Sequence, residues 1–133
     1  KIAILGFAFK ENTNDTRESP SIEICKNLLD EGAFLTIHDC KVTEDTIKKD
    51  LSDQNSSNKR LWSYQKDLCS ALEDSHAAII MTEWDIYKSI DWMKIIPIVK
   101  QPFWVFDTRL VLNPQEINEA GMNLWQLGYG KNN

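Results

Sequence analysis

Three cations of this sequence stand where their side chains could converge on an anion. Lys10 and Arg17 enclose a turn-rich segment that follows the apolar run of residues 2–5, and Arg109 follows an aromatic run near the other end of the chain. A guanidinium presents a planar fork that suits phosphate oxygens, and an ammonium is a compact point charge. The hydroxyl and amide groups between Lys10 and Arg17 could add neutral donors, so this pattern predicts a site for an anionic ligand such as a diphosphate.

The surrounding sequence alternates strand patterns with helix patterns. Strands are predicted at residues 1–9, 34–38, 61–64, 77–81, 103–106 and 123–127, the last of which would close the sheet before a frayed tail from Gly128 onward. Helices or helical turns are predicted at residues 21–31, 43–51, 67–73, 85–88, 91–95 and from Pro114, which Asn113 would cap. Residues 52–59 are rich in Ser, Asn and Asp and are predicted to form a surface loop.

This alternation predicts an α/β domain with a doubly wound, mainly parallel sheet and helices on both faces. The carboxyl ends of parallel strands share one edge of such a sheet, where ligands bind. Lys10, residues 82–84 and Arg109 each follow a predicted strand and should therefore lie at the same edge. The helix after Pro20 would point its N-terminus toward this edge as well, which also favours an anion.

Each cation also has a simpler interpretation as an ordinary surface residue. Arg17 could pair with Asp15 or Glu18 at a helix start, and Arg109 could pair with Asp107. The lysine after the first strand could be a solvated side chain, because strand-end loops of any α/β domain contain such residues. From the residue types alone, a shared anion site and separate surface pairs both remain open.

Two further positions at strand ends are ambiguous. Asp39 follows the second predicted strand, where a ribose-binding acid stands in dinucleotide sites, but the first strand lacks the GxGxxG turn that accompanies such an acid. Asp39 is therefore predicted to be structural or to begin a helix. Trp84, directly after Glu83, could pack in the core or line a cleft. The remaining tryptophans are predicted to be core or interface anchors: Trp62, Trp92, Trp104 and Trp125.

Composition excludes several classes of protein. The chain of 133 residues suffices for one domain with its own core, and its net charge of -5 argues against a nucleic-acid-binding protein. No apolar run approaches the roughly 20 residues of a membrane helix. No charged and apolar leader is recognised either. We therefore expect neither nucleic acid nor a membrane as a partner, and we expect a cytoplasmic location.

The cysteines give no sign of a metal or disulfide framework. Cys25, Cys40 and Cys69 are widely spaced and include no CxxC pair, which favours a reducing compartment. Each is predicted to be a small buried hydrophobic residue. No Ser/His/Asp triad, paired-carboxylate site or metal-ligand cluster is indicated, so neither a catalytic residue nor a metal site is predicted.

Four segments together resemble a known family. They read Lys-Ile-Ala-Ile-Leu-Gly-Phe-Ala-Phe-Lys at residues 1–10, Asn-Asp-Thr-Arg-Glu-Ser-Pro at 14–20, Thr-Glu-Trp at 82–84 and Phe-Asp-Thr-Arg at 106–109. In this order and spacing they resemble the C-terminal, UDP-binding domain of the UDP-glucose 6-dehydrogenases. The resemblance covers nearly the whole chain and implies a Rossmann-like fold for residues 1–133.

The resemblance also implies an activity and a site. Members of that family oxidise UDP-glucose to UDP-glucuronate with two molecules of NAD. By resemblance, Lys10 would be the main cation for the nucleotide sugar, Arg109 a second substrate contact, and Arg17 a residue that reaches across a domain cleft toward NAD. The implied substrate-binding segment comprises Phe9, Lys10, Glu11, Asn12, Thr13, Asn14, Asp15 and Thr16.

The remaining parts of such an enzyme would lie outside this sequence. By resemblance, an N-terminal NAD-binding domain, a central helix that supports dimerisation, and the catalytic cysteine and lysine all precede this segment. UDP-glucose, the N-terminal domain and a second copy of the enzyme are then the expected partners. The 133-residue chain alone should bind UDP or UDP-glucose weakly and catalyse nothing.

The sequence departs from the family pattern at three positions. Asn12 stands where Asp is common, Thr108 replaces a Gly, and Leu110 replaces a second Arg of animal members. Thr108 matters most, because a side chain there narrows the approach of a ligand to the backbone. Two alternatives stay open: the corresponding domain of a GDP-mannose or UDP-N-acetyl-sugar dehydrogenase, and an oligomerisation module without retained ligand binding.

Overall fold

The computed structural model describes residues 1–52 and 61–132. Its strands are β1 (Ile2–Leu5), β2 (Leu35–His38), β3 (Trp62–Tyr64), β4 (Ala77–Ile80), β5 (Trp104–Asp107), β6 (Asn123–Gln126) and β7 (Gly130–Asn132). Its helices are α1 (Pro20–Asp30), α2 (Glu44–Leu51), α3 (Leu68–Leu72), α4 (Asp85–Lys88), α5 (Trp92–Ile95), the 3-10 turn η1 (Ile96–Ile98) and α6 (Pro114–Glu119).

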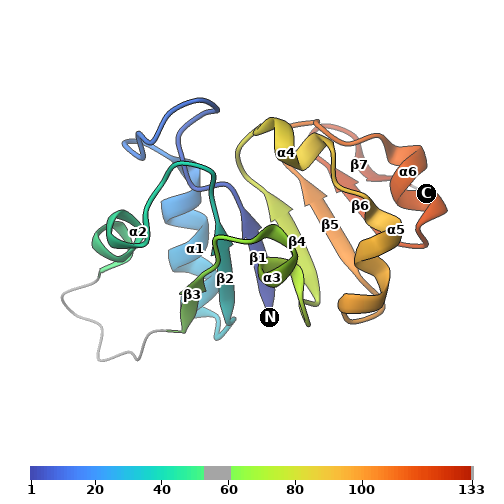
Figure 1. Cartoon of the computed structure of the whole chain (residues 1–133), viewed down its shortest axis with the longest axis horizontal. Coiled ribbons are helices and arrows are strands. Elements are labelled where there is room, and N and C mark those ends of the chain that lie inside the picture. The colour runs from blue at the N-terminus through green and yellow to red at the C-terminus, as the bar shows by residue number, and fades with distance from the viewer. Residues whose placement is uncertain (53–60, 133) are drawn as a thin grey trace.

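These strands form one sheet in the order β3-β2-β1-β4-β5-β6-β7 (Figure 1). β1 to β6 pair in parallel, and β7 runs antiparallel to β6. The chain moves outward from β1 to β3, returns to β4 beside β1, and then moves outward in the other direction. Because parallel crossovers are right-handed, α1 and α2 cover one face and the later helices cover the other. This confirms the predicted Rossmann-like, doubly wound α/β fold.

Local sequence signals explain where the helices begin and end. Ser19 caps α1 by accepting a hydrogen bond from the backbone N–H of Ser21 at 3.3 Å, and Pro20 fills the first helical position. Gly32, just past α1, has a φ of +91°, a conformation that glycine adopts at little cost. Asn113 caps α6 in the same way as Ser19 caps α1, as predicted.

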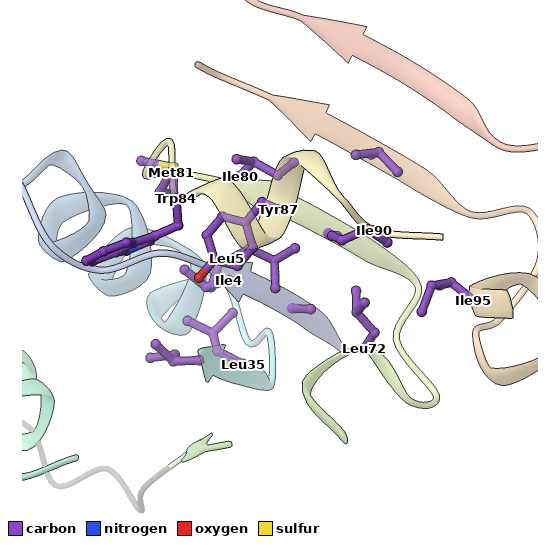
Figure 2. Packing of buried hydrophobic residues seen from close by; sticks show 14 of the residues in the cluster. Ile4, Leu5, Leu35, Leu72, Ile80, Met81, Trp84, Tyr87, Ile90 and Ile95 are labelled. Atoms are coloured by element: carbon purple, nitrogen blue, oxygen red, sulfur yellow. The ribbon is translucent and has the colours of Figure 1, made fainter. Parts of the chain in front are cut away.

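The core lies between the sheet and its helices. Ile4 and Leu5 of β1 and Ile80 of β4 are fully buried, and Tyr87 of α4 packs into the same cluster (Figure 2). Such runs of buried aliphatic residues are typical of parallel strands, which are covered on both faces. Burial raises the pKa of Tyr87 well above its ordinary value, because the ionised form would lose its hydration.

One half of the sheet is less covered on the face that carries α1. There Ile79, Phe106 and Trp125 of β4, β5 and β6 are only half-buried, and they line a groove of about 460 Å³ with Ile24 of α1. Arg109 stands at the rim of this groove. The expectation that the tryptophans are core or interface residues is confirmed for Trp62 and Trp92, which are buried in the core, whereas Trp104 and Trp125 are half-buried, and an interface role for these two stays a prediction.

Two expectations differ from the structure, and a third is not tested by it. The first strand ends at Leu5 rather than at residue 9, because Gly6 turns the chain with a φ of +103°. The strand at residues 123–127 does not close the sheet, since Gly128 (φ +88°) reverses the chain and β7 pairs with β6 in place of a frayed tail. The loop predicted at residues 52–59 falls, apart from Ser52, outside the described residues.

Candidate functional site

The carboxyl ends of β1, β4 and β5 form the edge at which the predicted cations meet. β1 lies between β2 and β4, so the connections from β1 and β4 lead to opposite sides, the switch point at which open α/β sheets bind ligands. The chain that joins β1 to α1, residues 6–19, rises from this edge (Figure 1). We call it the β1 loop, with residues 6–8 as its base and residues 9–17 as its tip.

Gly6 makes the turn out of β1 possible. Its φ of +103° is a conformation that residues with a side chain rarely adopt. A Cβ at this position would also collide with the side chain of Thr82 and would lie 2.7 Å from the backbone nitrogen of Thr82. The β1 loop and the end of β4 can therefore approach this closely only because residue 6 is a glycine.

Asp39 holds the loop base from the end of β2. It is 3% exposed, and its Oδ2 accepts hydrogen bonds from the backbone N–H groups of Phe7 and Ala8 at 2.7 and 3.0 Å and from the indole N–H of Trp84 at 3.2 Å. Its Oδ1 accepts two more, from the residues two and three positions further on. These bonds balance the burial of its charge. Asp39 is structural, as predicted, and Trp84 is a packing residue.

The carbonyl groups of the loop base are bonded as completely as its N–H groups. Ser21 donates its hydroxyl to the carbonyl of Gly6 at 3.2 Å, and Ser19 donates to Phe7 at 2.9 Å. Thr82 donates to the carbonyl of Ala8 at 2.9 Å. Since the N–H of Gly6 also bonds with the carbonyl of His38, every backbone polar group of residues 6–8 has a partner. The base is therefore a rigid support.

Arg109 connects the ends of all three strands. Its Nε donates to the carbonyl of Met81 just after β4 at 3.0 Å, and its Nη2 lies 3.5 Å from the carbonyl of Phe9 in the β1 loop. Its Nη1 lies 3.7 Å from a carboxylate oxygen of Glu83. The sequence also allowed Arg109 to pair with Asp107. In the structure it is the backbone N–H of Arg109 that bonds with this aspartate. The guanidinium itself lies beside the backbone that precedes Lys10.

Lys10 directly follows Phe9, whose carbonyl this guanidinium contacts, and it points into solvent. Its side chain is exposed and makes no hydrogen bond or ion pair with another residue in the described ranges 1–52 and 61–132. The residue after it, Glu11, donates its backbone N–H to Glu83 at 3.2 Å. The structure thus brings Lys10, Arg109 and Phe9 to one edge of the sheet, with the exposed ammonium of Lys10 and the partly exposed guanidinium of Arg109 at that edge.

The loop tip is closed by bonds within its own sequence. The N–H of Phe9 donates to the carbonyl of Asp15 at 2.7 Å, and Asn12 at the turn has a φ of +62°, which Asn tolerates better than most residues. Arg17 donates from Nη2 to Asp15 at 2.8 Å, so the simpler interpretation of Arg17 holds. This hydrogen bond lowers the pKa of Asp15 to about 2 and raises the pKa of Arg17.

The other polar residues of the tip divide into two groups. Thr16 is buried and donates its hydroxyl to Asp50 at 2.6 Å, so it ties the tip to α2. Thr13 and Asn14, with Asn12, line a hollow of about 410 Å³ together with Lys41. Lys41 was not among the predicted site residues, although its position two residues after Asp39 places it at the same edge of the sheet.

Thr108, the departure from the family pattern before Arg109, has a partner of its own. Its hydroxyl donates to the carbonyl of Ile80 at 2.6 Å. Its backbone N–H also lies 3.3 Å from that carbonyl. The side chain is therefore engaged with the end of β4, and the position of Arg109 is compatible with a threonine before it.

Further features of the described ranges concern metal ligands, membrane-spanning helices and cysteines. No cluster of three or more His, Cys, Asp or Glu side chains there could hold a metal ion. No helix in the same ranges is long and apolar enough to cross a bilayer. Cys25 is buried, which raises the pKa of its thiol to about 12, but Cys40 and Cys69 are exposed and correct the prediction that all three are buried.

The chain is similar to known proteins over almost its whole length. The sequence model of the UDP-glucose/GDP-mannose dehydrogenase family, UDP binding domain, matches residues 3–114. UDP-glucose 6-dehydrogenase 2 of Arabidopsis thaliana is 41% identical over 96% of this chain, and UDP-glucose 6-dehydrogenase of Pongo abelii is 44% identical over 96%. The chain spans only 29% and 27% of the lengths of these two relatives.

Solved structures agree with the fold. A UDP-glucose dehydrogenase from Pyrobaculum islandicum is 30% identical, with a TM-score of 0.64 over 83% of this chain and 22% of that protein. An NDP-N-acetyl-D-galactosaminuronic acid dehydrogenase from Methanosarcina mazei Go1 is 20% identical, with a TM-score of 0.77 over 97% of this chain and 24% of that protein. The second likeness concerns the fold alone. The resemblance predicted from the four sequence segments is confirmed.

Proposed function

The chain belongs to the UDP-glucose/GDP-mannose dehydrogenase family, whose UDP binding domain it matches, and we propose that it holds the UDP part of UDP-glucose where β1, β4 and β5 end. The observation that carries this proposal is the position of Arg109, whose Nη2 lies 3.5 Å from the carbonyl of Phe9, directly before Lys10. Two cations from opposite ends of the sequence thereby stand at the switch point of the sheet, where a diphosphate can bind both.

The proposed site assigns different tasks to different residues. Lys10 and Arg109 hold the phosphates, because both cations reach solvent at this edge. The exposed ring of Phe9 and the tip residues Glu11, Asn12, Thr13, Asn14 and Asp15 wrap the nucleotide sugar. Thr16 contributes by holding the tip against Asp50, since its hydroxyl is already engaged.

The activity belongs to a longer enzyme in this proposal. Relatives more than three times as long carry the name UDP-glucose 6-dehydrogenase, and we propose that this chain serves such an enzyme in oxidising UDP-glucose to UDP-glucuronate with two NAD. Its role is then to orient the sugar toward the reacting groups. We propose a homo-oligomeric, cytoplasmic enzyme, as the family resemblance implies.

The residues of this chain offer little support for NAD binding by the chain alone. The turn after β1 has no GxGxxG sequence, and Arg17, the proposed NAD contact, is paired with Asp15 on an exposed surface. These residues do not form a dinucleotide site, so we assign NAD mainly to an N-terminal domain outside this chain. The chain alone is expected to be inactive and to bind UDP weakly, because in this proposal the N-terminal domain supplies further contacts with the sugar and the nicotinamide.

A related substrate is the second candidate. Two solved dehydrogenases of N-acetyl sugars have TM-scores of 0.74 and 0.77 to this chain, but they are only 22% and 20% identical to it. The relatives that act on UDP-glucose by name reach 41% and 44% identity. Sequence identity therefore favours UDP-glucose over another nucleotide sugar.

Thermal unfolding with separate ligands tests the proposal. UDP and UDP-glucose should raise the unfolding midpoint, because a ligand at 100 times its dissociation constant adds about 2.7 kcal/mol to the free energy of unfolding. GDP-mannose and NAD should raise it little. A larger shift with GDP-mannose would move the assignment to a related enzyme. No shift with any nucleotide at millimolar concentration, together with a concentration-dependent dimer, would favour an oligomerisation module instead.

A further inference from the structure

Glu83 contacts two parts of the site with one carboxylate. Its Oε1 accepts the backbone N–H of Glu11 at 3.2 Å, and its Oε2 lies 3.7 Å from Nη1 of Arg109. The side chains of Glu83 and Arg109 are 27% and 29% exposed, so water screens this pair less than a pair on the open surface. Glu83 follows Thr82, which is buried and bonds with the carbonyl of Ala8. This bond holds the backbone from which the Glu83 side chain extends.

Glu83 and Arg109 hold the peptide groups on both sides of Lys10. Arg109 lies against the carbonyl of Phe9, the residue before Lys10, and Glu83 accepts the N–H of Glu11, the residue after it. The side chain of Lys10 is left exposed between these contacts. We call this arrangement the Glu83–Arg109 clamp. It fixes the backbone of Lys10 while its ammonium remains available.

We infer that Glu83 is a positioning residue of the UDP site, which sets Lys10 and Arg109 at a fixed separation before the ligand arrives. This inference rests on the proposed function, because it assigns a task within that site. Coulomb energy alone gives the opposite expectation, since a carboxylate beside a bound diphosphate repels it. Removal of Glu83 therefore weakens UDP binding if it positions the cations and strengthens binding if only its charge matters.

Calorimetric titration with UDP distinguishes these two roles. Glu83→Ala should weaken UDP binding about three- to tenfold, the range that the loss of one hydrogen bond gives. Glu83→Gln keeps an oxygen for the N–H of Glu11 and should restore the affinity to within about twofold of the parent chain. Asp85→Ala is the matched control, because it removes a carboxylate two residues away that is 94% exposed and paired with Lys88. It should leave the affinity unchanged or raise it slightly.

Amide hydrogen exchange of the ligand-free chain provides a readout that does not depend on UDP. The Glu11 amide should exchange at least about tenfold faster in Glu83→Ala and at the parent rate in Asp85→Ala. An alanine variant that binds UDP as tightly as the parent, or more tightly, overturns the inference. If the parent binds no UDP, the proposed function fails, and exchange alone decides on the clamp: an unchanged Glu11 rate in Glu83→Ala overturns it.

Discussion

The base of the β1 loop bonds with residues distant in sequence, whereas its tip bonds largely with itself. Residues 6–8 are buried and take partners from Asp39, Thr82 and the start of α1. In the tip, Phe9 bonds with Asp15 and Arg17 with the same aspartate. Other elements reach the tip through the bond of Thr16 with Asp50, the bond of Glu11 with Glu83 and the contact of Arg109 with the carbonyl of Phe9. Most tertiary hydrogen bonds of the β1 loop are therefore made by its base, and the Lys10 side chain in the tip stays accessible.

The difference between base and tip suits a binding site, because a rigid base can position an exposed tip. A buried carboxylate such as Asp39 is tolerated because five N–H groups surround it, and their number makes the loop base rigid. A site built on rigid elements positions its ligand groups more closely than one built on mobile loops. The exposed tip keeps its side chains hydrated until a ligand replaces the water. Substitutions in the base should therefore affect folding, and substitutions in the tip should affect binding.

Gly6→Ala should have the largest effect on stability. A methyl group there meets the backbone of Thr82 and a φ of +103°, so we expect a loss of about 3 kcal/mol or more in the free energy of unfolding. Gly121→Ala is the matched control, since its φ is +75° but nothing lies within 4 Å of the new atom. It should cost only about 1–2 kcal/mol. Equal losses in urea denaturation would show that the close approach at Gly6 is unimportant.

Asp39→Asn should come next. Its amide nitrogen cannot accept the hydrogen bonds that one carboxylate oxygen now takes, so we expect a loss of about 2–3 kcal/mol in the free energy of unfolding. Weaker UDP binding should accompany it, because Phe7 and Ala8 support the tip. The exposed Asp45→Asn should change stability by less than about 0.5 kcal/mol. An Asp39 variant as stable as this control would contradict the role of the loop base.

Mild acid should lower the free energy of unfolding through His38, beside the loop base, before it affects the Asp15–Arg17 ion pair of the tip. Burial lowers the pKa of His38, which precedes Asp39, below its ordinary value of 6.5. The unfolded chain then binds more protons than the folded chain as the pH falls through 6.5, so the free energy of unfolding should decrease below that pH. Asp15, with a pKa of about 2, keeps its pair with Arg17 well below pH 4. An NMR titration that gives His38 a pKa of 6.5 or higher would contradict this expectation.

Arg17→Ala should have the smallest effect. The side chain is 88% exposed, and exposed ion pairs contribute little to stability because water screens them. We expect no measurable change in the free energy of unfolding and little change in UDP affinity, since Arg17 is assigned to NAD in the longer enzyme. Chemical denaturation and calorimetry measure both. A loss comparable to that of Asp39→Asn would mean that the tip, too, supports the fold.

Much of the fold could be predicted from the sequence because its signals are local. Apolar runs separated by capping residues such as Asn113 gave the alternation of strands and helices, and this alternation placed Lys10 and Arg109 at one edge. β7 was missed because Gly-Lys-Asn has a low strand propensity. The turn at Gly128 was the available signal for it.

The partners of the site residues could not be predicted in the same way. The three bonds of the Asp39 Oδ2 atom join residues 31 to 45 positions apart, and the bond between Glu83 and Glu11 joins residues 72 positions apart. No periodicity records such contacts, which depend on the packing of three strands. The exposure of Cys40 and Cys69 depends on the same packing, so residue type alone misplaced them.

Titration of UDP into the 133-residue chain and into Lys10→Ala and Arg109→Ala tests the central claim most directly. Each variant should weaken binding by at least about 1 kcal/mol, or about fivefold, because each removes a charge-assisted hydrogen bond to the phosphates. Lys94→Ala, which removes a lysine that is 84% exposed on α5, should bind UDP as the parent does. If Lys10→Ala and Arg109→Ala also bind like the parent, the two cations do not form the UDP site.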